Sequence, residues 1–167
     1  AEDSSLDGAY QAIRDAAARI GDRQVRNRGT LGGSLCWNYV AACTPPVALA
    51  LGMEMALSGK GGERNVAADD FLGGPLETAR EDDEILVSLN LPAAPANSGS
   101  AYKKWGLVTD ALPVIGIAVM IDTDGSGACS SARVAVGGLG DGPRRSGAAE
   151  SGLKGASAGD GDAIAAA

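Results

Sequence analysis

Residues 20–35 read Ile20-Gly21-Asp22-Arg23-Gln24-Val25-Arg26-Asn27-Arg28-Gly29-Thr30-Leu31-Gly32-Gly33-Ser34-Leu35. From residue 25 onward this stretch is polar and glycine-rich and has no hydrophobic periodicity, which predicts a loop. Gly32 and Gly33 would let backbone N–H groups converge on phosphate oxygens, and the hydroxyl groups of Thr30 and Ser34 would add hydrogen bonds. Arginines just upstream supply positive charge. Taken alone the pattern is weak, because most Gly-Gly turns are only connections.

The stretch matches neither common nucleotide-binding fingerprint. Gly-Lys-Ser/Thr, which a Walker A loop requires, is missing, and so is GxGxxG between a strand and a helix. The ligand class therefore stays open at this point.

On either side, the apolar spacing indicates helices and strands. An amphipathic helix is predicted at 6–20, ended by Gly21, and a short apolar helix at 45–51. Strands are predicted at 53–57, 64–66, 85–91, 101–105, 114–121 and 132–136, with a turn at 69–71 and a last helix at 146–153. Residues 93–100 resemble a linker. The sequence thus predicts an α+β chain of two small lobes that divide near residue 95.

Composition excludes several classes of function. The formal net charge is −7, with 14 Lys+Arg against 21 Asp+Glu, so a basic nucleic-acid surface is not expected. No histidine is present, which excludes Ser-His-Asp triads, Cys-His pairs, HExxH zinc sites and histidine proton shuttles within this chain. Whatever chemistry the chain supports must therefore come from a cofactor or from carboxylates, lysines, hydroxyl groups and backbone groups. We expect no catalytic side chain and no metal site.

The cysteines and the chain ends bear on location. Cys36, Cys43 and Cys129 are odd in number and lack CxxC spacing, which favours reduced, buried thiols. No apolar run is long enough to span a bilayer, and the acidic N-terminal residues are unlike a signal peptide. We expect a cytoplasmic protein. The sequence begins without Met and ends in a helical pattern with no stop signal, so we expect a partial chain.

Residues 20–35 resemble the flavin-binding segment of the medium subunit of molybdenum hydroxylases, the family of carbon monoxide dehydrogenase and xanthine oxidase. Further segments occur in the family's order at 49–53, 61–64, 70–73, 83–86, 99–104 and 132–140. The resemblance implies the second lobe of a PCMH-type FAD-binding domain at 1–95. It also implies an incomplete α+β domain at 98–167, like the C-terminal domain of the carbon monoxide dehydrogenase flavoprotein. The resemblance further implies that the family's N-terminal FAD lobe has no counterpart in these residues.

The resemblance also implies site residues. Contacts with the flavin phosphates and ribitol are implied for Thr30, Leu31, Gly32, Gly33 and Ser34, and residues near the cofactor are Ile20, Leu86 and Lys103. Lys103 and Lys104 lie on opposite faces of a strand, so only one can face the flavin, and spacing slightly favours Lys103.

Departures from the family pattern follow the glycine pair. Cys43 stands where an acidic residue is expected to hold the adenosine ribose, and a thiol is a poor acceptor. Asn38 or Thr44 is a possible substitute. Trp37 and Tyr39 replace residues of the family's usual small-His-Asp-Pro segment and either stack on the flavin or adenine or pack between lobes. The acidic residues 81–84 are predicted to form a solvated turn rather than a docking or cation site. Arg144 and Arg145 are predicted to face solvent.

The function implied is that of an FAD-binding subunit in a multi-subunit oxidoreductase. A large molybdopterin subunit and a small subunit with [2Fe–2S] clusters are the implied partners, in a dimer of heterotrimers. FAD would relay electrons to an external acceptor, and the flavin itself would do the redox chemistry. The alternative is a flavin-free structural or interaction module that keeps the fold, which Cys43 and the absent lobe favour.

Overall fold

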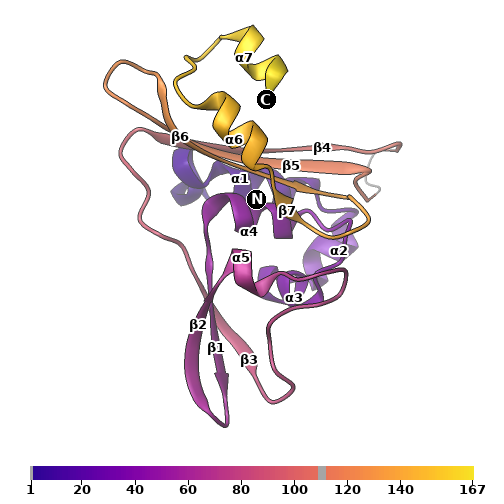
Figure 1. The fold of residues 1–167 in the computed structure, drawn as a ribbon. Coiled ribbons are helices and arrows are strands. Elements are labelled where there is room, and N and C mark those ends of the chain that lie inside the picture. The colour runs from indigo at the N-terminus through magenta and orange to yellow at the C-terminus, as the bar shows by residue number, and fades with distance from the viewer. Residues whose placement is uncertain (1, 109–111) are drawn as a thin grey trace.

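Two antiparallel β-sheets with helices between and around them form the computed structural model, which describes residues 2–108 and 112–167 (Figure 1). The first sheet has the order β2-β1-β3, and its strands are β1 (Glu54–Gly59), β2 (Gly62–Ala67) and β3 (Ile85–Asn90). The second has the order β4-β5-β6-β7, and its strands are β4 (Ser98–Trp105), β5 (Ile115–Thr123), β6 (Cys129–Gly137) and β7 (Arg144–Arg145). The predicted α+β class is confirmed.

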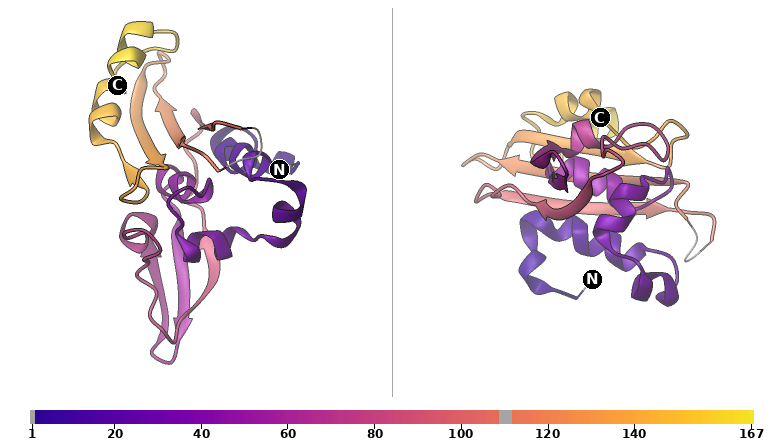
Figure 2. Two further views of the ribbon diagram at one scale, coloured as in Figure 1. Left: turned by 90° about the vertical axis from the view of Figure 1, so that its right-hand side faces the viewer. Right: turned by 90° about the horizontal axis from the view of Figure 1, so that it is seen from below.

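The helices cover both faces of the four-stranded sheet. Their bounds are α1 (Gln11–Arg19), α2 (Arg23–Arg28), α3 (Leu31–Trp37), α4 (Thr44–Leu51), α5 (Ala68–Phe71), α6 (Gly147–Leu153) and α7 (Gly161–Ala166). Two 3₁₀ turns, η1 (Ser4–Leu6) and η2 (Gly8–Tyr10), precede α1, so the helix predicted from residue 6 begins only at Gln11. Helices α1 and α4 pack against one face of the sheet, and α6 packs on the other (Figures 1 and 2).

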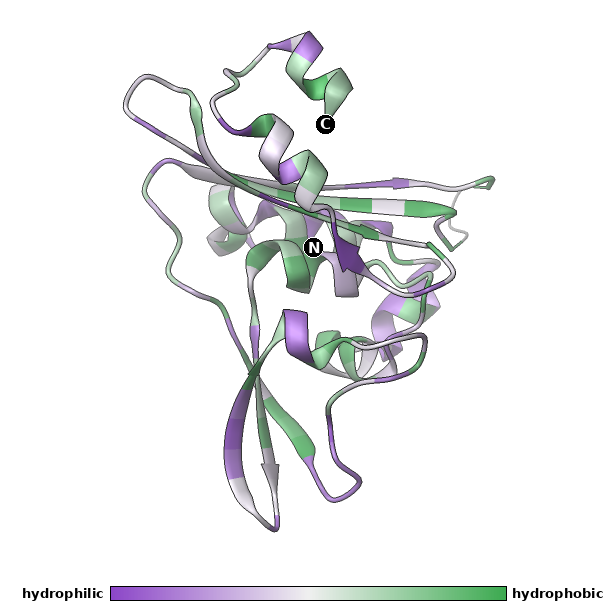
Figure 3. Cartoon of the chain, in the orientation of Figure 1, coloured by the Kyte–Doolittle hydropathy of each residue, from purple (hydrophilic) through white to green (hydrophobic). Residues whose placement is uncertain are grey.

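Helix α4 is the centre of the core. All eight of its residues are buried, and Figure 3 shows it as a mostly hydrophobic element between the two sheets. A helix that is apolar all round must be enclosed, which explains why it lacks a polar face. Proline in its first turn agrees with the predicted start, and Gly52, at φ 61°, ends it with an N–H bonded to the carbonyls of Ala48 and Leu49.

One group of buried side chains connects the two predicted lobes. Tyr102 of β4, Ala118 of β5 and Ala135 of β6 are aligned across the second sheet and join the same hydrophobic cluster as α1, α4 and β1. A boundary near residue 95 stays a prediction, and the packing of α1 and α4 against β4–β6 shows that residues from both sides of it share one core.

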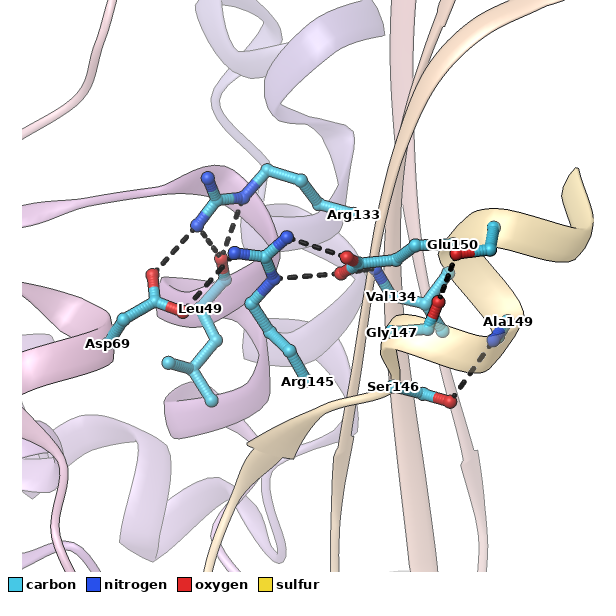
Figure 4. Close-up of polar contacts among 10 residues, drawn as sticks. Leu49, Asp69, Arg133, Val134, Arg145, Ser146, Gly147, Ala149 and Glu150 are labelled. Carbon is cyan, nitrogen blue, oxygen red and sulfur yellow. Dashed lines mark hydrogen bonds and ion pairs between the residues drawn. The ribbon is translucent and has the colours of Figure 1, made fainter. Parts of the chain in front are cut away.

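Arg133 and Arg145 form a polar connection across the same boundary (Figure 4). Arg133 on β6 donates two hydrogen bonds to the Leu49 carbonyl at the end of α4, at 3.2 and 2.9 Å, and one to Asp69 at 2.9 Å. Arg145 pairs with Asp69 at 3.4 Å and with Glu150 of α6 at 2.6 Å. Arg145 was expected to face solvent. Its side chain is instead only 32% exposed, because two carboxylates hold it against the sheet.

Among residues 2–108 and 112–167, no helix combines the length and the apolar character needed to cross a membrane.

Candidate functional site

A cavity of about 840 Å³ lies beside the C-terminal end of α1. Its wall includes residues of α1, the α1–α3 connection, the α3–α4 connection and one lysine of β4. Of the residues implied as cofactor contacts, Ile20, Thr30, Leu31 and Ser34 line it, and so does Cys43. Gly32, Gly33, Leu86 and Lys103 are not part of its wall. The structure therefore brings residues from the glycine-rich stretch together with residues well beyond it.

The stretch predicted as a loop forms two short helices, α2 and α3, so that prediction is wrong. Asp22 Oδ1 accepts a hydrogen bond from the Val25 N–H at 2.8 Å, and Thr30 Oγ1 accepts one from the Gly33 N–H at 3.0 Å. Each helix thus begins with an N-cap, which offsets the low helix propensity of glycine. The Asp and Thr at these positions were the sequence signal for two helix starts.

The glycines fit close around the first turn of α3. A Cβ on Gly33 would lie 2.9 Å from Thr30 Oγ1, so only glycine leaves the capping hydroxyl undisturbed. A Cβ on Gly32 would lie 3.4 Å from Leu86 Cδ2, which places Leu86 behind the turn rather than in the cavity wall. Leu31 and Gly32 hold the first two helical positions, where N–H groups have no intrahelical acceptor. These donors suit an anion such as a phosphate.

Two cations lie at the end of α1 in the cavity wall. Arg26 Nη1 donates to the carbonyls of Ile20 and Gly21 at 2.8 and 2.9 Å, and Lys104 Nζ donates to the Arg19 carbonyl at 2.7 Å. Positive groups are favoured at a helix C-terminus, where the carbonyls carry partial negative charge. Each side chain keeps further N–H donors, so both can also meet an anionic ligand in the cavity.

The two adjacent lysines of β4 point to opposite faces, as the alternation of a strand requires. Lys104 lines the cavity, whereas Lys103 is exposed and is not part of its wall. The cavity wall thus contains Lys104, whereas the sequence spacing slightly favours Lys103. The register of β4 could not be read from the lysine pair alone, and the buried Tyr102 is the residue that fixes it.

Cys43 lies at the junction between the cavity and the core. Its side chain is 6% exposed, and its Sγ lies 4.0 Å from the Arg19 carbonyl oxygen. The neighbouring Thr44 hydroxyl is 2.6 Å from the Ser34 hydroxyl, which links α3 to α4. Burial and the nearby Cys43 thiol raise the pKa of Tyr102. Ser34 and Thr44 both line the cavity, so their hydroxyl groups are the polar groups next to Cys43.

Asn38, the other candidate substitute for the acidic residue, has a different role. It is fully buried in the left-handed conformation at φ 41°, and its amide donates to the carbonyls of Gly73, Gly74 and Glu77. It anchors the end of α3 to the following loop and does not line the cavity.

The acidic stretch at 81–84 lies outside the cavity. Its first three residues are exposed, as expected of a solvated turn, but Glu84 is buried and accepts hydrogen bonds from Arg64 at 2.6 and 2.8 Å. The Arg64 guanidinium, helped by the Glu81 N–H, lowers the pKa of Glu84 to about 2. In the part of the chain that the structure describes, no group of three or more Cys, Asp or Glu side chains is arranged to hold a metal ion.

Comparison with known proteins identifies the family. Residues 1–94 match the family model described as the FAD binding domain in molybdopterin dehydrogenase. The chain belongs to this family. The resemblance found in residues 20–35 is therefore confirmed, and this FAD-binding family supplies the ligand class that the glycine-rich stretch alone left open.

Two curated relatives of this chain are named as the medium chain or medium subunit of an enzyme. The chain is 34% identical over 114 residues to the carbon monoxide dehydrogenase medium chain of Hydrogenophaga pseudoflava, covering 68% of this chain and 40% of that one. It is 36% identical over 123 residues to the nicotine 6-hydroxylase medium subunit of Paenarthrobacter nicotinovorans, covering 74% and 42%. The chain thus spans less than half of these relatives.

A solved structure gives the same fold. The carbon monoxide dehydrogenase of Hydrogenophaga pseudoflava lacking the Mo-pyranopterin moiety superposes with a TM-score of 0.89 at 31% identity. The match covers 98% of this chain and 56% of the other. Over the aligned residues, this chain therefore has the same fold as the carbon monoxide dehydrogenase chain.

Proposed function

We propose that this chain is part of the FAD-carrying subunit of a molybdenum hydroxylase-type oxidoreductase. In this proposal FAD takes electrons that reach it from a molybdopterin centre through [2Fe–2S] clusters and passes them to an external acceptor. The observation that carries the proposal is the cavity shared by the first turn of α3, Arg26 and Lys104 in a chain that belongs to an FAD-binding family.

The residues present fit a flavin nucleotide. The N–H group of Leu31, the Thr30 hydroxyl, Arg26 and Lys104 would hold the diphosphate, because these donors and cations all line the same cavity. The flavin supplies the redox chemistry when bound.

The ring system requires a different surface from the diphosphate. Ile20 and Leu31 give the same cavity an apolar wall suited to a ring system. The chain's own task in this proposal is to bind and orient the nucleotide and to limit its access to water.

The proposed partners are a large molybdopterin subunit and a small iron–sulfur subunit, assembled as a dimer of heterotrimers. The relatives' names support the partnership, since several are medium chains of dehydrogenases or the medium subunit of a hydroxylase. The cytoplasm is the proposed location, because Cys36, Cys43 and Cys129 are all free thiols, as in a reducing compartment.

A flavin-free interaction module is the second candidate, and Cys43 is the observation that favours it. A nearly buried thiol offers no acceptor comparable to a carboxylate for a ribose hydroxyl. In that case the fold would serve only to dock neighbouring subunits.

Isolating the protein together with its partner subunits and recording its visible absorption spectrum distinguishes the two candidates. The proposal expects flavin absorption and release of one FAD per chain by acid. Absence of both flavin absorption and releasable FAD, in a complex that still assembles, would overturn it in favour of the interaction module.

A further inference from the structure

Trp37 is an exposed tryptophan in the wall of the cavity. It is the last residue of α3, its side chain is 64% exposed, and it lines the cavity together with Tyr39, which is 37% exposed. The described residues do not bury it, so packing between the two predicted lobes does not account for it. Large aromatic side chains left uncovered at a cavity mouth are typical of ligand-binding surfaces.

The spacing along α3 places Trp37 at a useful distance from the phosphate donors. Six residues separate it from Leu31, which is about 9 Å along a helix with a rise of 1.5 Å per residue. A sugar unit bridges a comparable gap between a diphosphate and the ring attached to that sugar. A nucleotide whose diphosphate meets the first turn of α3 can therefore bring a ring to the tryptophan.

The surroundings of Trp37 suit a planar ring. Ala41, Ala42 and Leu112 line the same cavity and present small or apolar surfaces. Because the alanine side chains beside Trp37 and Tyr39 are small, a planar ring has space to reach the two aromatic side chains. Stacking on an indole depends on the π-face of the ligand rather than on a hydrogen-bond pattern.

We infer that Trp37 is a stacking platform for a planar ring of the flavin nucleotide, the adenine or the isoalloxazine. The inference rests on the proposed FAD site and assigns it a specificity-determining residue. Trp37 fixes the position of that ring, while the first turn of α3 holds the diphosphate.

Substitution of each tryptophan tests the role of Trp37 directly. Trp105 is the matched control, because it is the only other tryptophan, it is 58% exposed, and it is not part of the cavity wall. We expect Trp37→Ala to weaken FAD binding by about 10-fold or more, as for the loss of a stacked base. Trp37→Phe should keep most of the affinity, and Trp105→Ala should leave it unchanged. Far-UV circular dichroism and thermal melting check that each variant is folded.

Fluorescence gives a second readout that does not depend on affinity. In Trp105→Phe, where Trp37 is the only tryptophan, FAD should quench the emission strongly at saturation. In Trp37→Phe, where only Trp105 remains, quenching should be much weaker. Equal quenching in both variants would contradict direct stacking on Trp37.

Titration with ADP and with FMN shows which ring is stacked. Weaker ADP binding by Trp37→Ala identifies adenine, and weaker FMN binding identifies the isoalloxazine. A third result is that the unsubstituted protein and Trp37→Ala both bind FAD, and that each of FAD, ADP and FMN binds the two proteins with the same affinity. That result would contradict the stacking role of Trp37 and leave the FAD site intact. If the unsubstituted protein binds no FAD, the proposed function fails and the inference fails with it.

Discussion

Lys104 Nζ donates a hydrogen bond of 2.7 Å to the carbonyl oxygen of Arg19. The contact joins a strand of the second sheet to the C-terminal end of α1, inside the wall of the cavity. A residue distant in sequence from the glycine-rich stretch thereby becomes part of the same site. Its neighbour Lys103 has the same chemistry and faces away, which makes the pair a controlled comparison.

We expect Lys104→Ala to weaken FAD binding by about 10-fold, the usual effect of losing a hydrogen bond to a charged group. Lys103→Ala should bind FAD as tightly as the unsubstituted protein. Isothermal titration at low and moderate salt measures both. A larger loss of affinity for Lys103→Ala would show that Lys103, and not Lys104, faces the bound FAD.

Thr30 caps α3, so its substitution should affect the helix as well as the ligand. Thr30→Val removes the acceptor for the Gly33 N–H and should lower the free energy of unfolding by about 1 kcal/mol. Thr30→Ser keeps the acceptor and should stay close to the original stability. Urea denaturation measures both variants, and equal stability of Thr30→Val and Thr30→Ser would show that the cap contributes nothing.

Much of the fold was predictable because hydrophobic period and turn residues act locally. The alternation at 85–91 and the proline pair in the first turn of α4 correctly located a strand and a helix. The helical form of residues 25–28 and 31–34 is not predicted, because glycine content outweighs the two capping side chains in the sequence pattern. Local pattern also could not choose between Lys103 and Lys104, since that choice depends on which face of β4 meets α1.

Arg133 is expected to stabilise the contact between α4 and the second sheet. Arg133→Met keeps most of the side-chain volume but leaves the Leu49 carbonyl without its two donated hydrogen bonds. We expect a loss of about 1–3 kcal/mol of unfolding free energy, as for the loss of hydrogen bonds from a charged donor, since the Leu49 carbonyl then keeps only the Gly52 N–H. Arg144→Met is the control, because Arg144 pairs with Asp141 where both are largely exposed, and such pairs contribute about 0–1 kcal/mol. Chemical denaturation that ranks the two variants equally would contradict this role of Arg133.

Glu84 should contribute to the stability of the protein in a pH-dependent way. Because Arg64 lowers its pKa to about 2 in the folded protein from an ordinary value of 4.5, the folded state holds this proton less tightly than the unfolded state. The stabilisation is present above pH 4.5 and is lost as pH falls towards 2.

Glu84→Gln removes the charge at every pH. The variant should therefore be less stable than the original at neutral pH, and the difference should shrink on acidification from about pH 4.5 to about pH 2. Urea midpoints measured across this range give the difference, and a constant gap between the two proteins would exclude Glu84 as its source.

Tyr102 is buried with a hydroxyl that finds no hydrogen-bond partner in the described part of the chain. Tyr102→Phe removes an unsatisfied polar atom, so we expect unchanged stability or a gain of up to about 1 kcal/mol at neutral pH. Tyr10→Phe is the contrasting control, because the Tyr10 hydroxyl donates to the Pro92 carbonyl at 2.7 Å and accepts from the Ala94 N–H at 3.1 Å. That variant should lose about 1 kcal/mol.

The same burial predicts the behaviour of Tyr102 in alkali. Burial raises the pKa of Tyr102 above its ordinary value of 10, so the folded state keeps a proton that the unfolded state releases. Stability of the original protein should therefore fall as pH rises above 10, and Tyr102→Phe should reduce that fall. Denaturation midpoints between neutral pH and pH 11 measure the difference. Marked destabilisation of Tyr102→Phe at neutral pH would show that the hydroxyl is hydrogen-bonded, with the nearby Cys43 thiol as the candidate partner.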